Sequence, residues 1–224
     1  MKRRAKQQSD ANPSFKGFHI QPKNKKQDLL IRSIKEFSIS VAIGPAGTGK
    51  TYISAMTLAQ LFCTGKYNKI VLTRANVPTG RSLGFFPGDI KEKLTPWLNP
   101  MLNVFKKAFG EKYDYLLARD IIELQPLETV RGMSYEDCLI MVDEAQNLNF
   151  DEIKALTTRL GEGSKLVLSG DQSQSDVENG KSLMKFVDLC DKHNIEIPIV
   201  EFSVEDIVRS DIVAQLVKMY MTVK

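Results

Sequence analysis

Residues 44–51 read Gly44-Pro45-Ala46-Gly47-Thr48-Gly49-Lys50-Thr51, a complete G-x-x-x-x-G-K-T phosphate-binding loop. An apolar, strand-like run at residues 38–43 precedes this loop, and a helix-like run at residues 52–62 follows it. The glycines allow backbone N–H groups to turn inward around a chain of phosphates. The helix that starts there adds partial positive charge at its N-terminus. A chance glycine-rich turn is the alternative, and the intact spacing and context favour the phosphate-binding loop.

Each part of the loop has a predicted role in holding a nucleotide with its metal. Lys50 is expected to reach the β- and γ-phosphates, and the Thr51 hydroxyl is expected to hold Mg²⁺. We therefore take all eight residues of the loop as candidate nucleotide-binding residues and predict ATP and Mg²⁺ as cofactors. The Asn-Lys-x-Asp motif that reads guanine is not matched, because Asn68-Lys69 is followed by Ile70-Val71.

The composition is typical of one good-sized globular domain. The chain has 224 residues, of which 42% are hydrophobic and 26% charged. No apolar run approaches the roughly 18 residues of a membrane span, and the N-terminus lacks the apolar stretch of a secretory signal. Three widely spaced cysteines fit reduced thiols and show no metal-binding spacing. The sequence thus predicts a cytoplasmic protein without a membrane partner.

The charge is concentrated at the N-terminus. Residues 1–26 hold eight basic residues against one acidic residue, a net charge of +7 in a chain whose overall charge is +4. Residues 1–22 also contain few aliphatic side chains, so we predict a basic and mostly disordered arm there. Such an arm can contact nucleic acid phosphates. A solvated tail that only aids solubility is an equally good interpretation.

Downstream of the arm, strand-like and helix-like runs alternate. The predicted strands are residues 38–43, 69–73, 138–142, 165–169 and 195–202, with short candidates at 121–124 and 128–130. The predicted helices are residues 28–37, 50–62, 89–110 with interruptions at Pro96 and Pro100, 149–160, 181–193 and 203–221, the last capped by Ser203 and Asp206. Apolar strands separated by helices indicate an α/β fold, a three-layer arrangement with helices on both faces of a parallel sheet.

Two acidic residues follow the apolar strand at 138–142. Ligands of open parallel sheets bind at the carboxyl ends of the strands. Asp143 at that end is suited to complete the metal site begun by Thr51. Glu144 is then placed to orient or deprotonate the water that attacks the γ-phosphate. An Asp-Glu pair that merely caps the next helix is the alternative, which the phosphate loop 93 residues upstream of Asp143 disfavours.

Further site residues are suggested by similarity to helicases. Residues 169–174 read Ser-Gly-Asp-Gln-Ser-Gln and resemble the Gly-Asp-x-x-Gln motif of superfamily 1 helicases. By that resemblance Gln174 senses the γ-phosphate, and Asp171 lies near the metal and its water. In helicase-like ATPases a glutamine in the place of Gln27 reads the adenine edge, although a lone glutamine is commonly a surface residue.

The whole set of motifs resembles the PhoH family of ATPases. The matching pieces are Gly44 to Thr51, Ile70-Val71-Leu72-Thr73-Arg74, Leu83-Gly84-Phe85-Phe86-Pro87-Gly88-Asp89, Lys91-Glu92-Lys93, Arg131-Gly132, Asp143-Glu144-Ala145-Gln146-Asn147, Thr158-Arg159-Leu160-Gly161, Gly170-Asp171 with Gln174, and Asp206-Ile207-Val208-Arg209. The resemblance covers nearly everything from residue 20 onward. It implies a RecA-like P-loop NTPase core at residues 23–224, ATP binding, a cytoplasmic location and action on RNA.

This chain departs from the family pattern at several positions. Ala75 and Ser210 stand where the family often has proline and histidine, and Val177-Glu178 stands where it often has Leu-Pro. The phosphate contacts are untouched by these changes, whereas contacts to nucleic acid and to other subunits are less secure.

A single RecA-like domain leaves a bound nucleotide half open to water, so we expect a neighbouring subunit to supply a cation. An arginine supplied in this way raises the rate by roughly 10³- to 10⁵-fold. Arg159 and Arg209 are the first candidates, ahead of Arg131 and Arg74, and each is otherwise an ordinary surface arginine. We therefore predict a homo-oligomer, and the family resemblance favours a hexamer.

Nucleic acid contacts are predicted after the second strand. Thr73-Arg74, Gly80-Arg81 and Phe85-Phe86 lie where related motors meet a nucleic acid backbone. Aromatic side chains there can stack on bases of RNA or single-stranded DNA. Packing of Phe85 and Phe86 at a subunit interface is equally plausible.

Three functions are compatible with these residues to different degrees. The first is Mg-dependent ATP hydrolysis coupled to RNA or single-stranded DNA, with Lys50, Glu144, Gln174 and Arg209 as catalytic residues. The second is an ATP-dependent oligomeric switch that does not move on nucleic acid. A small-molecule kinase is the third, and it is disfavoured because the sequence shows no lid with clustered arginines.

Overall fold

The computed structural model describes residues 17–75, 90–171 and 181–221. Its centre is a six-stranded parallel sheet with the strand order β3-β2-β4-β5-β1-β6. The strands are β1 (Ile39–Ile43), β2 (Lys69–Arg74), β3 (Ile122–Leu124), β4 (Cys138–Asp143), β5 (Lys165–Gly170) and β6 (Ile199–Glu201). The predicted α/β fold with a parallel sheet is therefore confirmed.

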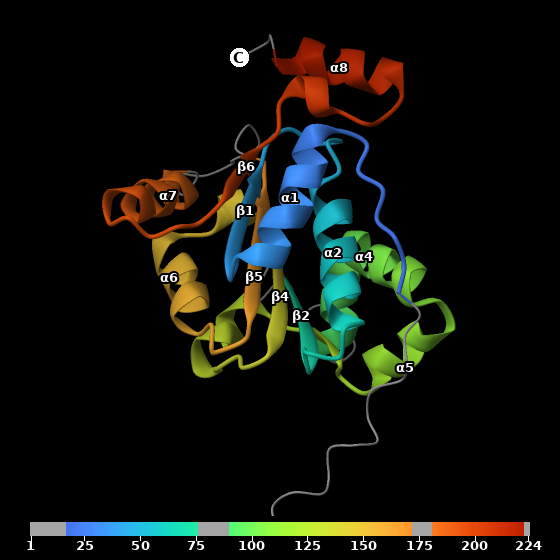
Figure 1. Ribbon diagram of the computed structural model, residues 1–224, viewed down its shortest axis with the longest axis vertical. Coiled ribbons are helices and arrows are strands. Elements are labelled where there is room, and N and C mark those ends of the chain that lie inside the picture. The colour runs from blue at the N-terminus through green and yellow to red at the C-terminus, as the bar shows by residue number, and fades with distance from the viewer. Residues whose placement is uncertain (1–16, 76–89, 172–180, 222–224) are drawn as a thin grey trace, which may run out of the picture.

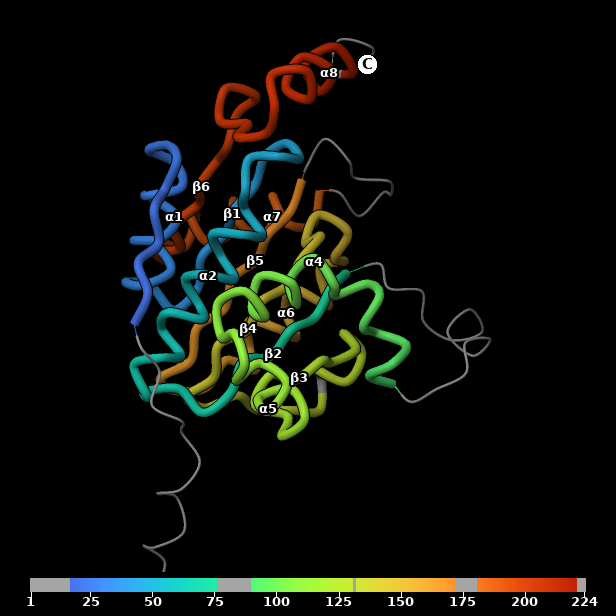
Figure 2. The backbone as a smooth tube through the Cα atoms, turned by 90° about the vertical axis from the view of Figure 1, so that its right-hand side faces the viewer, coloured from blue at the N-terminus to red at the C-terminus, as the bar shows by residue number. Residues whose placement is uncertain are grey.

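Helices cover both faces of the sheet (Figure 1). The α-helices are α1 (Lys25–Glu36), α2 (Lys50–Phe62), α4 (Ile90–Phe109), α5 (Tyr113–Ala118), α6 (Phe150–Thr158), α7 (Ser182–Lys192) and α8 (Asp211–Met221). Short 3-10 helices are η1 (Gly110–Lys112), η2 (Leu127–Gly132), η3 (Ala145–Asn147) and η6 (Val204–Asp206). Figure 2 shows α1, α2, α4 and α5 on the face toward the viewer, and α6 and α7 behind the sheet.

Each face of the sheet has its own apolar core. On the side of α1, α2 and α4, the core includes Leu30, Phe62 and Phe105 together with alternate residues of the strands. On the side of α6 and α7, it includes Ile153, Leu156 and Leu183. Every residue of β4 and β5 is buried, which is what a strand covered on both faces requires.

The structure differs from the prediction in helix α4, which is continuous through Pro96 and Pro100. The predicted interruptions were wrong. Proline removes one N–H from the helix ladder and frees a carbonyl one turn earlier. The two prolines are one turn apart and both are exposed, so they lie on a side of α4 that water reaches.

Two predicted strands also differ. Residues 128–130 form part of η2, because Thr129 donates from both its backbone N and its hydroxyl to the Pro126 carbonyl, at 3.1 Å and 2.8 Å. These local bonds replace pairing with a neighbouring strand. The predicted strand at 195–202 is shorter, since only residues 199–201 pair with β1. The Ser203–Asp206 cap is confirmed, although it starts η6 and not a long helix.

Residues 17–22, which the sequence assigned to the basic arm, lie against the domain. Ile20 is buried in the core, and the Phe18 carbonyl accepts a hydrogen bond from Gln60 Nε2 at 2.6 Å. Residues 1–16 of the predicted arm, as well as Phe85, Phe86 and Gln174, lie outside the described residues.

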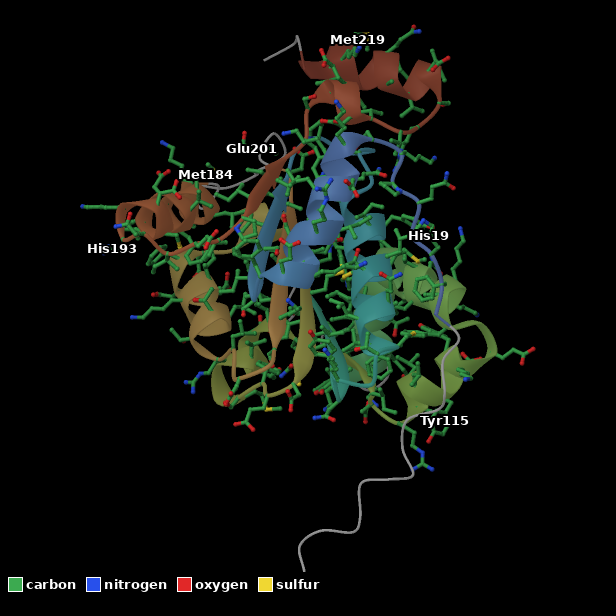
Figure 3. The ribbon with its side chains drawn as sticks, viewed as in Figure 1. His19, Tyr115, Met184, His193, Glu201 and Met219 are labelled. Atoms are coloured by element: carbon green, nitrogen blue, oxygen red, sulfur yellow. The ribbon has the colours of Figure 1, made fainter. Side chains whose placement is uncertain are left out.

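His19 and His193 lie on opposite sides of the molecule (Figure 3). Among the described helices, none is long and apolar enough to cross a membrane.

The strand order determines which loops meet at the upper edge of the sheet. β5 pairs with β1 on one side and with β4 on the other. Because all strands are parallel, the loops that follow β1, β5 and β4 leave the sheet at the same edge. The sequence motifs at 44–51, 143–146 and 169–171 are thereby placed next to one another.

Candidate nucleotide-binding site

A cavity of about 460 Å³ opens at this edge of the sheet. Its walls come from the phosphate loop, the ends of β2, β4 and β5, helix α4 and the segment before α8. The lining residues are Ala46, Gly47, Gly49, Lys50, Thr51, Tyr52, Arg74, Pro100, Val104, Asp143, Glu144, Ser169, Gly170, Asp171, Val208 and Arg209. The three loops that the sequence expected to converge therefore face one cavity, and their charged side chains come from strands far apart in sequence.

Lys50 lies at the bottom of the phosphate loop. Its Nζ donates to the carbonyls of Gly44 and Pro45, at 2.6 Å and 2.9 Å, and its side chain is buried. Burial lowers the pKa of Lys50, against the raising influence of three nearby carboxylates led by Asp171. The site thus holds a positive charge that is poorly hydrated and ready to accept an anionic ligand.

Thr51 and Asp143 form the candidate magnesium site. The Thr51 hydroxyl donates to Asp143 Oδ1 at 3.2 Å, which joins the start of α2 to the end of β4. Burial raises the pKa of Asp143, and so does the neighbouring Glu144 carboxylate, while Arg74 acts in the opposite direction. One hydroxyl and one carboxylate beside a phosphate cradle fit Mg²⁺, which takes few protein ligands and completes its shell with phosphate and water.

The first glycine of the loop is required by a close backbone contact. Gly44 has φ +142°, and a Cβ there would lie 2.3 Å from the carbonyl oxygen of Phe202. β6 ends beside this point, where Phe202 N donates to the Ile43 carbonyl at 2.7 Å. The loop and the end of β6 are thus pressed together, and only glycine fits between them.

We expect Gly44→Ala to lower the free energy of unfolding by about 2 to 6 kcal/mol, because backbone strain and overpacking each cost about 1 to 3 kcal/mol. Urea denaturation measures this change. Gly132→Ala is the matched control, because a Cβ at Gly132 meets nothing within 4 Å. Equal denaturation midpoints for the two variants would show that the close contact is not present.

Glu144 is held at both of its carboxylate oxygens. Oε1 accepts from Arg74 Nη2 at 3.0 Å, and Oε2 accepts from Gln146 Nε2 at 2.7 Å. The residue adopts a left-handed backbone conformation, with φ 53°, directly after the buried strand β4. A non-glycine residue in this region is uncommon and often marks a functional position.

The sequence motifs predict no role for Gln146, which lies within residues 143–147. Gln146 is 1% exposed, and its Oε1 accepts from the backbone N of Asp171 at 2.9 Å. Gly170 leaves the space for this contact, since a Cβ there would lie 2.7 Å from Gln146 Oε1. Gln146 therefore joins the loop after β4 to the loop after β5. The only sequence signal was an amide two residues after a candidate base.

Gln27 supports the phosphate loop from behind. Its side chain is 2% exposed, its Nε2 donates to the Thr48 carbonyl at 2.9 Å, and its Oε1 accepts from Lys23 N at 2.8 Å. Both ends of its amide thus contact backbone groups of this chain, and Gln27 does not line the cavity. Reading of an adenine by this side chain requires those bonds to exchange and stays a prediction.

The candidate arginines lie in different places. Arg209 lines the cavity of its own chain, and a Cβ at Gly47 would lie 3.3 Å from Arg209 Cδ. The preceding residue holds this segment on the loop, because Val208 N donates to the Gly47 carbonyl at 3.0 Å. Arg159 is exposed at the end of α6, on the opposite edge of the sheet. The side chain of Arg131 lies outside the part that the structure describes.

Comparison with known proteins agrees with the motifs. The family model described as PhoH-like protein matches residues 19–221. The PhoH-like protein of Bacillus subtilis is 35% identical over 222 residues, which are 95% of this chain and 67% of that protein. The PhoH-like protein of Mycobacterium tuberculosis is 36% identical over 92% of this chain and 59% of its own length. Protein PhoH of Escherichia coli is 33% identical, over 85% and 55%.

This chain therefore matches only about 55 to 67% of the length of these relatives. Among solved structures, the large terminase from a thermophilic bacteriophage has a similar fold. The TM-score is 0.54 at 13% sequence identity, over 86% of this chain and 49% of the terminase chain. A likeness at this identity concerns the fold alone.

Proposed function

The chain belongs to the PhoH-like protein family, and on that premise we propose that it binds and hydrolyses Mg·ATP. The observation that carries this proposal is the single cavity shared by Lys50, the Thr51–Asp143 pair and Glu144. A cation for the phosphates, oxygen ligands for Mg²⁺ and a carboxylate for the attacking water are the parts that phosphoryl transfer to water requires.

In the proposed reaction Lys50 exchanges its bonds to the loop carbonyls for bonds to the β- and γ-phosphates. Thr51 and Asp143 would hold Mg²⁺, which would supply positive charge against the phosphate oxygens. Glu144 accepts a proton from the water that attacks the γ-phosphorus, while the bond from that phosphorus to the β,γ-bridging oxygen breaks and ADP leaves. Gln174 is proposed to sense the γ-phosphate by its resemblance to helicases.

Titration calorimetry and a phosphate-release assay test this proposal. ATP should bind in the presence of Mg²⁺, and turnover should disappear when the metal is chelated. GTP in place of ATP examines the base preference. A chain that binds neither nucleotide, or that turns ATP over at the same rate without divalent metal, would contradict the proposal.

Arg209 is proposed to act on the nucleotide of its own chain. It lies beside Gly47, and its segment is anchored by the Val208–Gly47 bond and by Asn24 Nδ2, which donates to the Asp206 carbonyl at 3.2 Å. A cation supplied by a neighbour then has to come from another arginine, and Arg159 is the candidate because it lies on the far edge of the sheet. A ring, hexameric by family resemblance, brings such an edge to a neighbour's cavity.

We propose further that hydrolysis is coupled to RNA or single-stranded DNA and takes place in the cytoplasm. Support comes from the basic N-terminal sequence and from three free thiols, Cys63, Cys138 and Cys190. ATP turnover with a panel of RNA and DNA strands tests the coupling, with particle size followed by light scattering. Stimulation that falls steeply with salt supports phosphate contacts. Binding of ATP without any response to nucleic acid favours the oligomeric switch.

A further inference from the structure

Arg74 makes two hydrogen bonds that connect separate parts of the site. Its Nη2 contacts Glu144 Oε1 at 3.0 Å, and its Nη1 donates to the Trp97 carbonyl of α4 at 2.8 Å. The register of the sheet sets this position, because Arg74 pairs with Asp143 at the ends of β2 and β4. Strand pairing thus fixes the backbone of Arg74, and the hydrogen bond to the Trp97 carbonyl fixes its guanidinium.

From this geometry we propose that Arg74 is a positioning residue that fixes the Glu144 carboxylate for activation of the attacking water. The inference rests on the proposed ATPase function and extends it to a residue outside the phosphate-binding and acidic motifs. Arg74 touches neither phosphate nor water in this role and acts through Glu144.

The Glu144 carboxylate needs such support for two reasons. It stands next to the carboxylate of Asp143, and two adjacent like charges tend to turn away from each other. Glu144 itself adopts a left-handed backbone conformation and its side chain is 31% exposed, so the hydrogen bonds from Arg74 and Gln146 are what limit its rotation. A misplacement of about 1 Å in a catalytic group can cost about 100-fold in rate.

Stabilisation of the fold does not account for this ion pair. The side chains of Arg74 and Glu144 are 23% and 31% exposed, and a pair with that much access to water contributes roughly 0 to 1 kcal/mol. Removal of Arg74 should therefore leave the chain folded. Lysine is a poor substitute, because its single ammonium lacks the fork that serves Glu144 and Trp97 together.

Steady-state ATP hydrolysis by the full chain tests the inference. We expect Arg74→Ala to lower kcat by about 10- to 100-fold, the usual effect of removing a group that orients a ligand or base. KM for ATP should stay within about 3-fold of the wild-type value, because the proposal gives Arg74 no contact with the phosphates. The kcat of Arg74→Lys should fall between those of the wild type and Arg74→Ala. Arg119→Ala is the matched control, since Arg119 is exposed and does not line the cavity.

A double-mutant cycle distinguishes action through Glu144 from any other role. In the Glu144→Gln background, Arg74→Ala should change the residual kcat by less than about 2-fold. A full additive loss in that background, an unchanged kcat in Arg74→Ala, or an increased kcat would each overturn this inference alone. A wild-type chain that hydrolyses no ATP would overturn the proposed function and this inference with it.

Discussion

Replacing Lys50 with alanine is expected to lower ATP turnover by at least about 100-fold and to remove most nucleotide binding. The loss of one preorganised donor to developing charge typically costs 10²- to 10³-fold. Lys50 is also the cation at the base of the phosphate loop, within 3.5 Å of the Thr48 hydroxyl and bonded to two loop carbonyls. Phosphate release and titration calorimetry with ATP measure the two effects separately.

Lys165→Ala is the matched control for this variant. Lys165 is another buried lysine whose pKa is lowered by burial, and its Nζ donates to the Phe37 carbonyl at 2.8 Å. It starts β5, at the edge of the sheet opposite the cavity. Any loss caused by removing a buried lysine in general appears in both variants. Wild-type ATP affinity in Lys50→Ala would show that the cavity is not the nucleotide site.

Glu144→Gln is expected to bind ATP with near wild-type affinity and to lower kcat by about 10²- to 10⁴-fold, the range attributed to general acid–base catalysis. Glutamine keeps the size of the side chain and can still accept from Arg74, but it cannot take a proton from water. Calorimetry with ATP and Mg²⁺ should therefore give a normal titration, while a single-turnover assay should show slow hydrolysis.

The control for the glutamate variant is Glu152→Gln. Glu152 belongs to the capping box of α6, where its Oε2 accepts from Asn149 N at 2.8 Å, and a glutamine serves equally well in that motif. Its turnover should equal that of the wild type. If Glu144→Gln also keeps wild-type turnover, the base has been assigned to the wrong residue.

Local sequence signals predicted several residues that line the cavity. Lys50, Thr51 and Asp143 each belong to a short pattern, either a glycine-rich loop between a strand and a helix or a carboxylate at the end of an apolar strand, and the structure places all three at the cavity. The cap at Ser203 and Asp206 was found in the same way. Local patterns were less reliable for α4, where two prolines indicated interruptions that their exposed positions make unnecessary.

The sequence by itself determined the class of the fold and the candidate residues of each loop, because phosphate-binding loops and buried strands depend on neighbours in the chain. Only the tertiary structure decided which side chains contact those residues. Arg74 reaches Glu144 across 70 residues, Gln27 reaches Thr48 across 21, and Gln146 reaches Asp171 across 25. Contacts of this kind arise from strand order and register, which place distant residues at one edge of the sheet and leave no periodic pattern in the sequence.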